Sequence, residues 1–115
     1  MVVVETPHFL RRAEALMSDE ERSELVTFLG ENPEAGVVMA HTGGVRKLRW
    51  ALPGRGKRGG ARVIYYYHND DFPLFLLSAY AKNEKANLTR TEQNALRGAV
   101  KLLMDGYPPS GERQQ

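Results

Sequence analysis

The sequence predicts an α+β domain in which a small antiparallel sheet carries helices packed on one side, in the order β-α-α-β-β-β-α. Two patterns favour this class. Apolar residues recur at helical spacing in the first and last thirds of the chain, whereas the middle alternates apolar and polar residues or is almost wholly apolar, as strands are. The 115 residues fit one domain, which we place at residues 1–109, followed by a disordered tail at 110–115.

The N-terminal third is expected to form a short strand and two helices. Three valines before a proline predict a strand that ends near Thr6. Apolar residues at helical spacing then predict a helix that ends around Met17. Ser18 and Glu21 have the spacing of a capping box, so a second helix begins there, and it is expected to end before Pro33.

The middle of the chain is expected to supply three further strands. Residues 34–44 are read as a loop, and in the strand after it apolar and basic residues alternate. Lys47 and Arg49 therefore share one face of that strand and project away from the core. The next strands are predicted at residues 62–69 and 75–80, the second so apolar that it suits a central position.

A long helix is predicted to end the fold. Thr89 and Glu92 repeat the capping-box spacing, and Pro108 follows the last apolar residue of the helical pattern. The apolar stripe that is expected to face the core consists of Leu96, Val100, Leu103 and Met104.

Charge is distributed very unevenly along the chain. Residues 1–34 carry eight acidic and three basic residues, while no acidic residue lies between Glu34 and Asp70. Residues 45–67 include seven Arg or Lys, which predicts a binding surface for a polyanion. Aromatic residues interleaved with these cations are candidates to stack on bases: Trp50, Tyr65, Tyr66 and Tyr67.

Several classes of site are excluded by composition and spacing. Cysteine is absent, so disulfides and thiolate catalysis are excluded, and a cytoplasmic location is expected. No apolar run reaches the roughly 20 residues of a membrane span, and no secretory signal is recognised at the start. The three histidines are scattered, so neither a metal site nor any cofactor is expected. The Gly-rich segment at residues 54–57 joins two strands, which is the wrong context for a phosphate-binding loop.

Cations alone are sufficient for one reaction on RNA. When a 2′-hydroxyl attacks the adjacent phosphorus, negative charge develops on the non-bridging oxygens, and Arg or Lys side chains directed at them stabilise it. A Lys whose pKa is lowered by neighbouring cations can also act as general acid or base. A metal-independent endoribonuclease is therefore compatible with the residues present.

Residues 45–88 resemble the RelE/HigB superfamily of bacterial toxins, and most closely its HigB-like branch. Three segments carry the resemblance: Arg46-Lys47-Leu48-Arg49-Trp50, the glycine-rich connection and strand at residues 56–66, and residues 76–89. The order of elements over residues 1–107 agrees as well. The resemblance implies a RelE-like fold and a toxin that cleaves mRNA in the ribosomal A site. It also implies that a cognate antitoxin with a helix-turn-helix motif neutralises the toxin.

The resemblance also assigns residues. It implies a phosphate contact for Arg62, a catalytic cation at Lys82 and a basic pair at Lys47 and Arg49. Lys57 and Lys85 match motifs of the branch, Lys57 as a catalytic and Lys85 as an RNA-binding residue. The tyrosine that some members have near the start of the last helix is replaced here by Leu88 and Thr89, so either Tyr80 or a lysine takes its part or the chemistry of this chain is slower. The other residues expected to bind RNA are Arg46, Arg55, Arg58 and Tyr80.

Two other functions remain open at this point. A ParE-like gyrase poison shares the fold and lacks nuclease residues, and the density of cations on the central strands favours the nuclease over it. A non-enzymatic module that binds RNA or the ribosome is the second alternative, because phosphate binding and phosphate catalysis use the same side chains.

Overall fold

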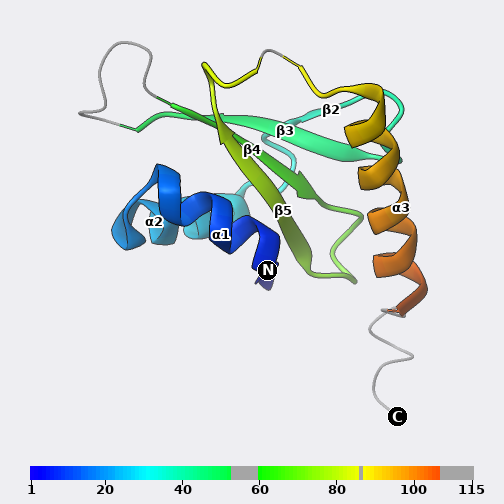
Figure 1. The fold of residues 1–115 in the computed structure, drawn as a ribbon. Coiled ribbons are helices and arrows are strands. Elements are labelled where there is room, and N and C mark those ends of the chain that lie inside the picture. The colour runs from blue at the N-terminus through cyan, green and yellow to red at the C-terminus, as the bar shows by residue number, and fades with distance from the viewer. Residues whose placement is uncertain (53–59, 86, 107–115) are drawn as a thin grey trace.

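The computed structural model describes residues 1–52, 60–85 and 87–106, which form an α+β fold with a five-stranded sheet and three helices (Figure 1). This confirms the predicted class. The elements in chain order are β1 (Val3–Glu5), α1 (Pro7–Leu16), α2 (Asp19–Glu31), β2 (Val37–Val38), β3 (Val45–Trp50), β4 (Ala61–Tyr66), β5 (Leu74–Ala81) and α3 (Arg90–Gly106).

The sheet is mixed, with the strand order β1-β5-β4-β3-β2. Strands β2 to β5 pair antiparallel, whereas β1 runs parallel to β5. The predicted antiparallel pairing therefore holds for β2 to β5 but not for β1, which lies at the edge of the sheet beside β5 and runs parallel to it. The loop predicted at residues 34–44 also contains the two-residue edge strand β2.

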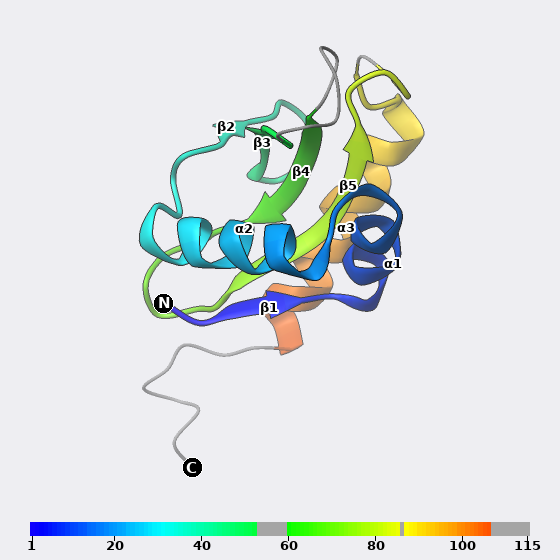
Figure 2. The same ribbon diagram turned by 90° about the vertical axis from the view of Figure 1, so that its left-hand side faces the viewer.

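The helices lie on both faces of the sheet and not on one side as predicted. In Figures 1 and 2, α1 and α2 cover one face and α3 covers the other. The alternation of β4 explains this arrangement. Val63 and Tyr65 point to the side of α1 and α2, and Ile64 and Tyr66 point to the side of α3. Because β4 and β5 are apolar on both faces, each face needs a covering layer.

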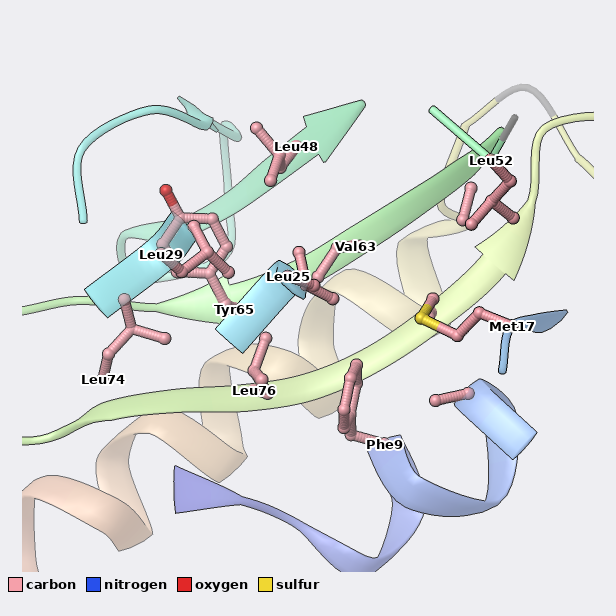
Figure 3. Packing of buried hydrophobic residues seen from close by; sticks show 13 residues of the cluster. Phe9, Met17, Leu25, Leu29, Leu48, Leu52, Val63, Tyr65, Leu74 and Leu76 are labelled. Atoms are coloured by element: carbon pink, nitrogen blue, oxygen red, sulfur yellow. The ribbon is translucent and has the colours of Figure 1, made fainter. Parts of the chain in front are cut away.

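The main core lies between the sheet and the first two helices (Figure 3). Phe9 of α1 and Leu25 and Leu29 of α2 are fully buried there. They pack on Val63 and Leu76, and the predicted alternation of β3 holds because Leu48 belongs to the same cluster. A second, smaller cluster forms under α3, where Val100 is the helix's buried residue.

Both predicted capping boxes are present. The Ser18 hydroxyl accepts from the Glu21 amide at 3.1 Å, and the Glu21 carboxylate accepts from the Ser18 amide at 2.8 Å. At α3, the Thr89 hydroxyl accepts from the Glu92 amide at 3.1 Å, and Glu92 accepts from the Thr89 amide at 2.9 Å. Each pair satisfies amides that a helix start would otherwise leave unpaired.

The Tyr65 hydroxyl connects the segment before the edge strand β2 to the sheet, and its removal tests how much this connection stabilises the fold. Its buried hydroxyl donates to the Pro33 carbonyl and accepts from the Gly36 amide, both at 2.8 Å. Tyr65→Phe leaves both backbone groups without this partner, so we expect it to lower the free energy of unfolding by about 1–3 kcal/mol. Urea denaturation measures the effect. The control is Tyr67→Phe, which removes an exposed bond to Asp70. An equal loss in both variants would contradict the structural role of Tyr65.

None of the helices in the described ranges is long and apolar enough to cross a membrane. The predicted glycine-rich connection, apart from Gly60, and the predicted tail at 110–115 lie outside the described residues.

Candidate nucleic-acid interface

Three side chains form a row across the middle strands of the sheet. Arg49 of β3 is the register partner of Arg62 of β4, and Arg62 is the partner of Tyr80 of β5. Residues directly opposite one another in a sheet point to the same face. That face is the α3 side, because Ile64, two residues from Arg62, belongs to the cluster beneath α3. We call Arg49, Arg62 and Tyr80 the cation row.

Lys47 extends this row on the same face. It pairs with Ile64, so it lies two residues along β3 from Arg49. Arg49 is exposed, and Arg62 and Lys47 are half-buried. Within residues 1–52, 60–85 and 87–106, no carboxylate forms an ion pair with these three cations. Like charges directly opposite each other destabilise a sheet, so the arrangement favours an anionic ligand that bridges them.

Lys82 lies at the same end of the sheet as Arg49 and Arg62. Its amide donates to the Gly60 carbonyl at 3.3 Å, immediately beyond the last pair of β4 and β5, and its side chain is exposed. Glu84 fixes this turn, because it accepts from the Ala81 amide at 2.8 Å and from Arg12 through both carboxylate oxygens at 2.7 Å. The Ala81 hydrogen bond, and then that from Arg12, lower the pKa of the Glu84 carboxyl. The Glu84 carboxyl is therefore ionised at neutral pH, and it accepts the hydrogen bonds that hold the turn in that form.

Tyr80 is the buried member of the row, with 2 % of its surface exposed. Its hydroxyl has no hydrogen-bond partner in the described part of the chain. Lys85 Nζ lies 4.9 Å from the Tyr80 ring centroid and donates to Glu92. Burial raises the pKa of the Tyr80 hydroxyl, with Arg62 acting in the opposite direction, and the Lys85 hydrogen bond is the main cause of a lowered pKa at Glu92. Tyr80 is therefore a neutral phenol at neutral pH.

A comparison with protein-family models matches residues 1–106 to RelE, described as the RelE toxin of the RelE/RelB toxin-antitoxin system. The chain belongs to the RelE toxin family. RelE toxins generally act on mRNA at the ribosome and are bound by an antitoxin. The assignment to the HigB-like branch stays a prediction.

Within this RelE-family fold, Arg46 lies on the opposite face from the cation row. Its guanidinium donates to the carbonyls of Glu34 at 3.2 Å and Gly36 at 2.8 Å, and its side chain is only 18 % exposed. These bonds fasten the segment before β2 to β3. The placement argues against the predicted RNA contact, because Arg46 and Arg49 are three residues apart and so point to opposite faces.

The aromatic residues expected to stack on bases serve the fold. The Trp50 ring packs against Phe28 of α2, with ring centroids 5.4 Å apart. Tyr65 and Tyr66 are buried, and Tyr67 donates to Asp70 at 2.9 Å. Base stacking by this group is therefore not supported, because the Tyr65 and Tyr66 rings are buried and the Trp50 and Tyr67 rings pack against the core.

Lys85 is also less available than predicted, because Glu92 holds it against Tyr80. The three other predicted cations, Arg55, Lys57 and Arg58, lie outside the described residues. Glu84 and Glu92 were not predicted as part of this site. The capping role of Glu92 was recognised in the sequence. The separation of Glu92 from Lys85 along the chain does not predict their ion pair, because the pair depends on the path of the turn before α3.

The described ranges contain no group of three or more His, Asp or Glu able to hold a metal ion. The side chains that the cation row and its flanks bring together offer charge stabilisation by guanidinium and ammonium groups, together with one buried phenol.

Proposed function

We propose that this chain is a ribosome-dependent endoribonuclease that cleaves mRNA in the ribosomal A site, halts translation and is neutralised by a cognate antitoxin. The observation that carries the proposal is the cation row, in which Arg49 and Arg62 face each other across neighbouring strands without an acidic partner among the described residues. Lys47 and Lys82 flank the pair. Membership of the RelE toxin family supports the same activity.

The proposed reaction is attack of a ribose 2′-hydroxyl on the adjacent phosphorus. The 2′-hydroxyl gives up its proton to solvent as its oxygen forms a bond to phosphorus, the bond from phosphorus to the 5′-oxygen breaks, and the 5′-oxygen takes up a proton from the protein. Arg62 grips the non-bridging oxygens with its planar fork, and Arg49 adds charge from the neighbouring strand. Charge that develops on these oxygens in the transition state is stabilised more than charge in the ground state.

We propose that Lys82 donates the proton that the leaving 5′-oxygen takes up. Its side chain is exposed at the end of β5, whereas the Tyr80 hydroxyl is buried and Lys85 lies over the Tyr80 ring. Tyr80 then acts as a positioning residue, since its ring supports Lys85 and its place in the row orients Arg62. No step in this scheme uses a metal ion, so cleavage is expected to persist when transition metals are chelated with magnesium held constant.

Expression of the chain in cells without its antitoxin tests the proposal. We expect growth arrest in which protein synthesis stops before any DNA damage, with mRNA cut at positions that follow the reading frame. Pulse labelling of protein and mapping of mRNA 5′ ends measure both effects. DNA breaks that depend on gyrase, with translation intact, would establish a ParE-like activity instead. Translation arrest with uncut mRNA would establish a non-enzymatic ribosome-binding module.

A further inference from the structure

Arg12 of α1 links the first helix to the C-terminal end of β5. Its Nε donates to the Ala79 carbonyl at 2.8 Å, and its Nη2 donates to both carboxylate oxygens of Glu84 at 2.7 Å. Among the described residues, β1 pairs with β5 only as far as Leu76, so the end of β5 has no strand beside it on this edge. Helix α1, which packs along β5 (Figure 2), supplies a hydrogen-bond donor there instead.

Glu84 connects Arg12 to the turn that carries Lys82. The Glu84 carboxylate accepts from the Ala81 amide at 2.8 Å, and the Glu84 amide donates to the Ala81 carbonyl at 3.0 Å. Lys82 therefore lies between two residues that are bonded to each other, and its own amide donates to the Gly60 carbonyl at 3.3 Å. The backbone from which the Lys82 side chain extends is thus fixed both within the turn and from α1.

The attachment of α1 to the sheet does not depend on this link. Phe9 of α1 is fully buried in the main core, and the Thr6 hydroxyl, which caps α1, donates to the Leu76 carbonyl at 2.7 Å. The side chains of Arg12 and Glu84 are 36 % and 43 % exposed. Ion pairs as exposed as this one contribute little to stability, so the main consequence of the link is a fixed turn.

Arg12 is not placed to contact substrate at the cation row. It belongs to α1, which covers one face of the sheet, whereas the cation row points to the other face, the side of α3 (Figures 1 and 2). Any effect of Arg12 on a reaction at the cation row must therefore pass through another residue.

We propose that Arg12 is a positioning residue, which acts through Glu84 to place the Lys82 ammonium group for proton donation. The inference rests on the proposed function, in which Lys82 gives a proton to the leaving 5′-oxygen. A proton donor must come within hydrogen-bond distance of its acceptor, and a displacement of about 1 Å can cost about 100-fold in rate. Because lysine has a long flexible side chain, a fixed backbone limits the positions that its ammonium group can reach.

Arg12→Ala is expected to lower kcat for ribosome-dependent cleavage about 10-fold and to leave KM within about twofold, because Lys82 acts in the transition state. Glu84→Ala is expected to lower kcat at least as far, because it removes the partner of both Arg12 and the Ala81 amide. The two substitutions remove opposite charges. A purely electrostatic effect on Lys82 would therefore change its pKa in opposite directions, whereas loss of positioning lowers kcat in both variants.

A double-mutant cycle with Lys82→Ala identifies the residue through which Arg12 acts. If Arg12 acts through Lys82, then Arg12→Ala lowers kcat by less than about twofold when Lys82 is already alanine. A loss of folded protein would instead lower the rate by the same factor in both backgrounds. The control is Arg22→Ala, which removes a similarly exposed pair from α2 to Glu5 of β1, at 3.2 Å, and should cleave like wild type. Unchanged kcat in Arg12→Ala and Glu84→Ala, or equal losses with and without Lys82, would overturn the proposal.

Amide hydrogen exchange gives a readout that does not depend on cleavage. We expect the Ala81 and Lys82 amides to exchange about 10-fold faster in Arg12→Ala than in wild type, with the Val63 amide in the middle of β4 unchanged. Unchanged exchange at Ala81 and Lys82 would show that Arg12 does not hold the turn, and the proposal would fail. A wild-type chain that does not cut mRNA on ribosomes would refute the proposed function, and the exchange rates would still decide whether Arg12 fixes the turn.

Discussion

Arg62→Ala is expected to lower the rate of ribosome-dependent mRNA cleavage about 100-fold or more, which is the usual cost of removing one group that stabilises transition-state charge. Arg62 occupies the centre of the cation row, between Arg49 and Tyr80. Its side chain has no ion pair within the described ranges, so its charge is free to act on substrate. Because it faces Arg49 directly, its removal also relieves a like-charge contact.

The same substitution should leave the fold as stable as wild type or slightly more stable, and this contrast separates function from structure. Arg62→Lys keeps the charge but loses the two-pronged geometry, so an intermediate rate is expected. Arg11→Ala, at an exposed position of α1, is the matched control and should cleave normally. A stably folded Arg62→Ala protein with wild-type cleavage would remove Arg62 from the mechanism.

Much of the fold was predictable because its signals are local. Both capping boxes fixed the starts of helices, and the alternation around Leu48 identified the face that packs on α2. The place of α3 was not predictable in the same way. An apolar strand such as β5 shows that both faces are buried, but not which helix covers which face.

The candidate site, too, was predictable from the sequence where its signals are local and not where it depends on long-range contacts. Lys47 and Arg49 were placed together by strand periodicity, and the register then added Arg62 and Tyr80 across the sheet. Arg46 was grouped with these cations because composition counts charges without assigning them to a face of the sheet. The burial of Tyr80 and its contact with Lys85 depend on the turn after β5, which the Arg12–Glu84 pair holds. Long-range contacts of this kind have no signal in a single sequence.

Cleavage of naked mRNA is expected to be at least about 1,000-fold slower than cleavage of the same mRNA on programmed ribosomes. Alignment of a reacting pair is worth about 7–11 kcal/mol in favourable intramolecular reactions, so a site without alignment loses several orders of magnitude in rate. Lys47, Arg49 and Arg62 stand on the adjacent strands β3 and β4 and point to one face, so they approach a phosphate from one side. They stabilise charge but do not by themselves place the 2′-oxygen in line with the leaving oxygen.

The ribosome holds A-site mRNA in a fixed path, so it can supply the order that this surface lacks. The measurement compares initial rates of cleavage for one mRNA, with and without ribosomes, at equal protein concentration. The Arg62→Ala protein, purified in the same way, reports any contaminating ribonuclease, since its residual activity on naked RNA should equal that of wild type. Fast cutting of naked RNA by wild type but not by Arg62→Ala would show that the chain aligns its own substrate. In that case residues beyond the cation row must hold the ribose, and the one-sided site described here would be incomplete.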